Sequence, residues 1–187
     1  MSDTEVRQNM KEAIEIVESV HGFPDSMRSV QFTTFTGPAD HLGEYDMLTR
    51  SIDINTTNPE LRSTLVHEIG HAIDHGAFEG SGLASAMPRT PQMRAWREAV
   101  WNSEAVRALK GEPEDQYTTY LRSLPEIWAH SYAQWVAVRS GDEQLLTELR
   151  SRLSSSEADQ YRQWEDQDFE PIAEALDHIF QSEGWLK

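Results

Sequence analysis

The chain has no cysteine among its 187 residues. This absence excludes disulfide bonds, thiolate-held metal ions and cysteine nucleophiles. Any metal ion that the protein binds must therefore be held by histidine, aspartate or glutamate side chains.

Long apolar segments are also absent. No stretch approaches the roughly 20 apolar residues that a membrane-spanning helix needs. The first five residues lack the basic start that introduces the apolar core of a signal peptide. These features predict a cytoplasmic protein, and export by a Sec-independent route stays open.

Basic residues are scarce, with 16 lysines and arginines against 32 acidic residues and a formal net charge of -16. Such a charge disfavours non-specific attraction to nucleic acid or anionic lipid. We therefore expect neither nucleic acid nor a membrane as a partner. A cationic substrate is compatible with the charge, and so is a merely hydrated acidic surface. The sequence does not indicate an oligomeric state.

The length and composition fit one domain spanning residues 1–187, because 38% of the residues are hydrophobic and 26% are charged. The acidic helical C-terminal part, about residues 142–187, keeps several large apolar residues. We expect these to dock this part on the domain. They are Trp164, Phe169, Ile172, Leu176, Ile179, Phe180 and Trp185.

The N-terminal third alternates between helical and strand-like patterns. Helical spacing of apolar residues predicts a helix over 4–20, and β-branched or alternating segments at 30–36, 44–48 and 51–55 predict a small antiparallel sheet. Asn58 is a suitable N-cap for the next helix, which should place Pro59 at its first position and end near residue 75.

The remainder is predicted to be helical after a loop rich in glycine, serine and proline at 76–91. Helices are expected from residue 93 to near residues 111–113 and over about 125–138, 142–153 and 158–181, the last broken at Pro171. The fold class is therefore α+β and mainly helical, with a small antiparallel sheet before the helix that follows residue 58.

That helix contains the motif His67-Glu68-Ile69-Gly70-His71. Residues four apart lie on one helix face, so both imidazoles can reach one Zn²⁺ ion. Glu68, one step round the helix, would lie beside the open coordination position, where a general base is needed.

A catalytic zinc usually has three protein ligands, so one more must be found. The metzincin pattern needs Gly at position 74 and His at position 77, where this chain has Asp74 and Ala77. His75 lies one turn beyond His71, but ligands from three successive turns of a straight helix do not easily converge.

Glu126 is the better candidate for the third ligand. It opens a later helix, and Ala129 would let that helix approach the motif helix closely. A first-turn glutamate favoured by the helix dipole is the alternative. His130 lies one turn further on the same face and could be a neighbouring group, a transition-state donor or an alternative ligand. Asp74 could orient a ligand imidazole or simply be solvated.

Together these residues are typical of gluzincins. More narrowly, residues 67–74 and 126–132 resemble the anthrax-lethal-factor-like peptidases of toxins, phages and mobile elements, whose helices read HExGHxxD and ExxAxxF/Y. The metallopeptidases that cut phage repressors share a looser version of this pattern. The resemblance implies a zincin-like peptidase domain, a zinc cofactor, a protein or peptide substrate and Glu126 as third ligand.

Such enzymes commonly place a tyrosine before the third ligand to stabilise the oxyanion. Tyr120 is the preferred candidate here, with Tyr117 as the alternative, and His130 could share the role. The expected activity is peptide-bond hydrolysis with Glu68 as base. A strand near 52–54 is expected to pair with the substrate backbone. The alternatives are a different zinc hydrolase and a non-catalytic phage or mobile-element interaction protein with a structural or vestigial zinc site.

Overall fold

The computed structural model describes residues 2–38, 41–78, 82–87, 91–154 and 162–187. Eleven α-helices and strands and one short 3₁₀ helix follow one another in these ranges. They are α1 (Asp3–Val20), η1 (Asp25–Ser29), β1 (Gln31–Phe35), β2 (Gly43–Asp46), β3 (Ser51–Asn55), α2 (Leu61–Gly76), α3 (Met93–Asn102), α4 (Glu104–Gly111), α5 (Gln116–Leu121), α6 (Leu124–Ser140), α7 (Glu143–Leu153) and α8 (Asp166–Ser182).

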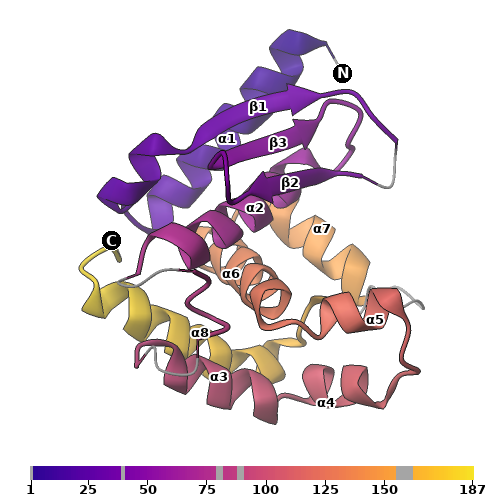
Figure 1. Ribbon diagram of the computed structural model, residues 1–187, viewed down its shortest axis with the longest axis vertical. Helices are drawn as coiled ribbons and strands as arrows, with labels where there is room; N and C mark the ends of the chain where they lie inside the picture. Colours follow the sequence, from indigo (N-terminus) through magenta and orange to yellow (C-terminus); the bar gives the residue numbers. More distant parts are fainter. Residues whose placement is uncertain (1, 39–40, 79–81, 88–90, 155–161) are drawn as a thin grey trace.

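The elements form two parts with α6 between them (Figure 1). The sheet, α1 and α2 make up the upper part, whereas α3, α4 and α8 make up the lower part. Helix α6 packs on α2, on α1 and on α8, so it joins the two parts. The predicted α+β, mainly helical fold class is confirmed.

The sheet is mixed, so the prediction of an antiparallel sheet was wrong. Its strand order is β1-β3-β2, with β3 parallel to β1 and antiparallel to β2. The short turn after β2 forces β3 to return antiparallel beside it. Strand β2 follows β1 in the chain but lies on the far side of β3, and β1 runs parallel to β3. Alternation along a strand indicates which faces are buried, but not which strand lies beside it.

The helix that carries the histidine motif starts later than predicted. Its N-cap is Glu60, because the side chain of Asn58 closes a turn by accepting the Glu60 N–H at 2.8 Å. The amide of Asn58 also donates to the Thr64 hydroxyl at 2.8 Å. Asn58 thus ties the end of the sheet to α2 without capping it.

Three later predictions also need correction. The single helix expected from residue 93 to near 111–113 is two helices, because Ser103 is extended and caps α4 with its hydroxyl. Pro171 does not break α8, whose buried apolar face holds the helix continuous through it. Helix α8 begins at Asp166, later than the predicted start, and residues 158–161 of that prediction lie outside the described residues. Helix α5 was not predicted, and a capping box of Asp115 and Thr118 starts it.

The C-terminal end of the chain meets the end of α1 around a buried histidine. His21 ends α1 and pairs with Leu186 in an isolated antiparallel bridge. Its Nε2 lies 2.7 Å from the Tyr132 hydroxyl, and its ring packs against Trp135 and Phe180. Burial lowers the pKa of His21 to about 4. The apolar residues of α8 belong to the same core as those of α1 and α2.

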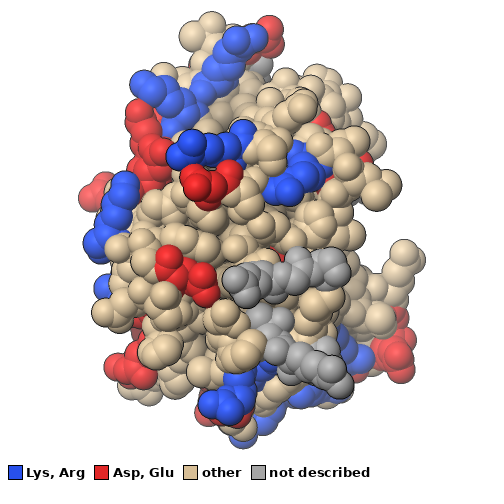
Figure 2. Space-filling view, turned by 60° about the vertical axis from the view of Figure 1, so that its left-hand side comes forward, with Lys and Arg blue, Asp and Glu red and all other residues tan. Residues whose placement is uncertain are grey.

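The surface carries its charge in mixed form. On the face in Figure 2, acidic and basic side chains are interspersed and separated by wide uncharged areas. No described helix combines the length and the apolar character needed to cross a membrane.

Helices α2 and α6 cross closely at Gly70. A β-carbon added there would lie 2.9 Å from Cδ1 of Tyr132 and 3.2 Å from Cα of Ala129. The carbonyl of Gly70 also accepts the indole N–H of Trp128 at 2.9 Å. Both helices are buried over most of their length, and the missing side chain at Gly70 lets their backbones approach.

Replacing Gly70 with alanine should therefore destabilise the protein, although alanine favours helices. Overpacking of a filled core costs about 1–3 kcal/mol, which exceeds the gain of up to about 1 kcal/mol from helix propensity. Urea unfolding would measure the change. Gly111→Ala is the matched control, because a β-carbon at Gly111 meets nothing within 4 Å. Equal stability of Gly70→Ala and wild type would contradict the close crossing.

Candidate metal centre

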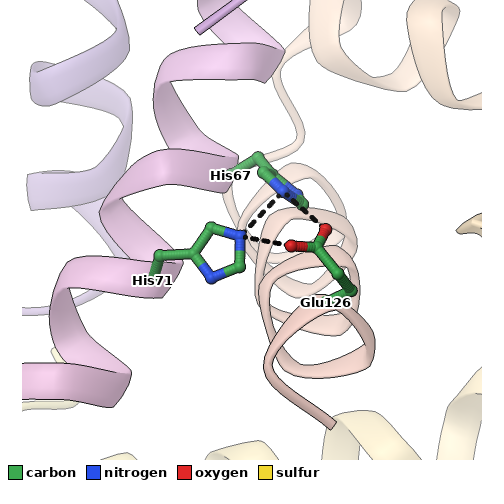
Figure 3. A group of neighbouring side chains, drawn as sticks. All are labelled: His67, His71 and Glu126. Carbon is green, nitrogen blue, oxygen red and sulfur yellow. Dashed lines mark hydrogen bonds and ion pairs between the residues drawn. The ribbon is translucent and has the colours of Figure 1, made fainter. Parts of the chain in front are cut away.

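Three ligand side chains converge at the crossing of α2 and α6. His67 and His71 project from α2, and Glu126 projects towards them from the first turn of α6 (Figure 3). The two Nε2 atoms are 3.1 Å apart. The Glu126 carboxylate lies 3.4 Å from Nε2 of His67 and 3.2 Å from Nε2 of His71.

This triangle of donor atoms can hold a metal ion. Donors bound tetrahedrally at about 2.0–2.1 Å from one ion lie about 3.3 Å apart. The separation of the two Nε2 atoms is close to this, and so is the distance from each Nε2 to its nearer Glu126 oxygen, Oε2 for His67 and Oε1 for His71. Oε2 of Glu126 is buried and makes no hydrogen bond within the described residues. A buried carboxylate oxygen without a donor is costly, and a cation between the three side chains would satisfy it.

Glu126 keeps the negative charge that favours a bound cation. Burial opposes ionisation of Glu126, but His67 and His71 outweigh it and hold the pKa of the carboxyl well below its ordinary value. Burial lowers the pKa of His71, whereas Glu126 and the nearby carboxylates of Glu68 and Asp74 raise it more, so the net shift is upward. Glu126 is therefore an anion at neutral pH.

Glu68 lies beside the triangle and is buried, with 6% of its surface exposed. Burial raises its pKa, against the lowering effect of His67 and His71. The backbone N–H of Tyr45 in β2 also lowers it, by a smaller amount. No residue type signals a backbone donor, so this influence could not be expected from the sequence.

Tyr120 lies at the rim of the centre and is half exposed. Partial burial raises its pKa, and so do the charge of Glu126 and a hydrogen bond to it. The phenol therefore stays protonated and can donate. The alternative tyrosine, Tyr117, also faces this region and contacts Arg162 through its hydroxyl.

His130 lies one turn beyond Glu126 and is buried. Its ring centroid is 4.4 Å from that of His67, while its Nε2 is 3.9 Å from the Glu126 carboxylate. Burial and the charge of His67 lower its pKa well below the ordinary value, so the ring is neutral. Among the described residues, the metal-binding group comprises His67, His71 and Glu126 without His130.

The other two candidates point elsewhere. Nδ1 of His75 lies 2.9 Å from the hydroxyl of Tyr45, outside the described metal-binding group. Asp74 is buried and accepts hydrogen bonds from the backbone and hydroxyl of Ser85, both at 2.6 Å. It therefore anchors the segment after α2 and is neither solvated nor hydrogen-bonded to His71.

The strand beside the centre is β2, not the predicted strand at 52–54. That segment belongs to β3, which is paired on both sides and has no edge left for a substrate. In the β2–β3 ladder the N–H of Asn55 donates to the carbonyl of Leu42 at 3.0 Å. Because such pairs alternate, the backbone groups of Gly43 and Tyr45 point away from β3, along the free edge.

Two cavities meet at Glu68 and Tyr120, one on each side of the centre. The first, of about 320 Å³, is here named the arginine cavity. Its lining includes His67, Glu68, Tyr117, Tyr120, Arg152 and Arg162. The second, of about 270 Å³, is named the Leu83 cavity. Its lining includes Tyr45, Glu68, His71, Leu83, Tyr120 and Glu126.

Comparison with protein-family models, curated proteins and solved structures finds no significant match. The chemistry of the centre must therefore be argued from its own residues.

Removing the third donor should weaken metal binding. We expect Glu126→Ala to lower the bound metal per chain by at least about tenfold after dialysis against a weak chelator, because two imidazoles then remain. Metal content by mass spectrometry measures this. His75→Ala and Glu44→Ala should retain wild-type content, since neither side chain belongs to the triangle. If His75→Ala loses bound metal and Glu126→Ala does not, the third ligand is His75 on α2 and not Glu126.

Proposed function

We propose that this chain is a zinc-dependent endopeptidase. One observation carries the proposal: two histidines and a glutamate from crossing helices form a metal triangle, and a further buried glutamate lies beside it. A purely structural metal site has no need for that second acidic group. Its presence favours catalysis over a structural or vestigial site.

The donor set favours zinc. Two imidazole nitrogens and one carboxylate leave a fourth tetrahedral position open, as in catalytic zinc sites. His67, His71 and Glu126 would hold the ion. When bound, zinc would lower the pKa of a coordinated water to about 7 and polarise the carbonyl of the bond to be cleaved.

Glu68 is suited to act as the general base and then as the acid that protonates the leaving amine. Burial raises its pKa from the ordinary value, which brings its proton affinity closer to that required at neutral pH. His67, His71 and the backbone N–H of Tyr45 act against this shift and lower the pKa.

Tyr120 is the preferred donor to the developing oxyanion. It lines both cavities where they meet, next to Glu68, and its raised pKa keeps its proton in place at neutral pH. The neutral ring of His130 lines only the arginine cavity and is the second candidate. Both groups would stabilise charge that appears only in the transition state.

An extended peptide fits the strand beside the centre. The outward backbone groups of Gly43 and the outward carbonyl of Tyr45 offer hydrogen bonds that do not depend on the substrate's side chains. Gly43 also has no room for a side chain, since a β-carbon would lie 2.9 Å from both Ile54 and Thr64. The strand is thereby held close to α2. This free edge, together with the resemblance of the two motif helices to peptidases, supports an amide substrate.

The base is tested by Glu68→Gln. We expect this variant to keep wild-type zinc content while its rate of peptide cleavage falls by at least about 100-fold, because a glutamine cannot accept the proton. Cleavage of a quenched fluorescent peptide library measures the rate. Glu98→Gln, an exposed helical site, should change neither property. A fully active Glu68→Gln protein would overturn the mechanism.

The oxyanion donor is tested by Tyr120→Phe. Loss of a donor that acts in the transition state should lower kcat by about tenfold or more and change KM much less. Tyr117→Phe and His130→Gln test the two alternative donors. If kcat falls with His130→Gln and not with Tyr120→Phe, the role belongs to the histidine.

A further inference from the structure

The two cavities beside the metal triangle differ in charge. Among the described residues, the arginine cavity is lined by Arg152 and Arg162, and Glu68 is its one acidic group. The Leu83 cavity is lined by Glu44, Glu68 and Glu126, with no lysine or arginine among its described lining. Positive side chains thus lie on one side of the metal triangle and acidic side chains on the other.

Arg152 is held in place rather than mobile. Its side chain is 18% exposed and forms an ion pair with Glu60, the N-cap residue of α2. It also donates to the Ser63 hydroxyl at 2.7 Å. Both contacts use Nη2, so the Nε and Nη1 donors of this guanidinium remain for a group inside the cavity.

Arg162 approaches the same cavity from the segment before α8. It contacts the hydroxyl of Tyr117, and its guanidinium lies 5.4 Å from the centroid of that ring. Both arginines and the buried His130 line this one cavity. Two guanidinium groups therefore lie beside the metal triangle on the same side.

We propose that the arginine cavity binds a carboxylate of the substrate, an acidic side chain on one side of the cleaved bond. This inference rests on the proposed peptidase function and names its substrate class. A guanidinium is the group best matched to a carboxylate, because its planar donors can form two parallel hydrogen bonds.

The net charge of -16 does not argue against an acidic substrate. At physiological salt, charges more than about 8 Å away are largely screened. The guanidinium groups act at short range in a partly buried cavity, where screening is weaker. The whole-chain charge thus describes the outer surface, while the cleft lining sets the local preference.

The position of the arginine cavity also predicts on which side of the cleaved bond the acidic residue lies. The arginine cavity adjoins residues 41–43 at the start of β2, and the Leu83 cavity adjoins the end of that strand. A peptide that pairs antiparallel with β2 would place its C-terminal part in the arginine cavity. The acidic residue is then expected after the cleaved bond.

The zinc-loaded full chain should be profiled with a library of amidated peptides in which each position is varied. We expect Glu or Asp to be preferred over Gln or Asn by about tenfold at one position after the cleaved bond. Arg152→Gln and Arg162→Gln should each reduce this preference. A matching set with free C-termini distinguishes a side-chain carboxylate from a terminal one.

Two controls separate recognition from structure. Arg150→Gln makes the same charge change at an exposed position of α7 and should keep the preference. Glu60→Gln removes the ion-pair partner of Arg152, and we expect it to keep or strengthen the preference, because a competing carboxylate is gone. If Glu60→Gln and Arg152→Gln reduce the preference for acidic residues equally, Arg152 acts only by holding α2, and the proposal is overturned.

The remaining outcomes distinguish the two proposals. Cleavage with no preference for acidic residues would overturn this inference and leave the peptidase function standing. If no peptide is cleaved, fluorescence anisotropy with the zinc-loaded chain tests binding directly. Tighter binding of Glu than of Gln peptides that depends on Arg152 supports the carboxylate site without the peptidase. Equal binding overturns it.

Discussion

The close crossing of α2 and α6 is the constraint on which the metal centre depends. His67 and His71 lie on one face of α2 by helical spacing, but a third ligand must come from another element. Gly70 lies between the two histidines and leaves space for the backbone at Ala129 and the ring of Tyr132. The crossing brings the first turn of α6, and with it Glu126, within ion-pair distance of both imidazoles.

Burial gives the same region its electrostatic character. Glu68 and Glu126 are both buried, yet their pKa values move in opposite directions. Burial dominates at Glu68 and favours its protonated form, whereas two facing imidazoles keep Glu126 ionised. One carboxylate is thus suited to bind a cation and the other to exchange a proton. Two groups of the same chemistry acquire different roles from their neighbours.

The sheet contributes through its backbone and its order. Because β3 is central, β2 is left with a free edge next to α2. The same edge runs between two cavities of different charge. In the proposed function, this strand would offer pairing groups to an extended peptide, and the side chains beyond its ends would distinguish one substrate from another.

The sequence by itself determined the features that depend on local spacing. The helical placement of His67, Glu68 and His71, the candidacy of Glu126 and the mainly helical fold class all followed from patterns within a few turns. Only the tertiary structure decided which strand has the free edge, that Asp74 anchors Ser85 and not a ligand, and that Arg152 lies beside the centre. These depend on contacts between segments far apart in the chain, and residue types alone do not encode which segments meet.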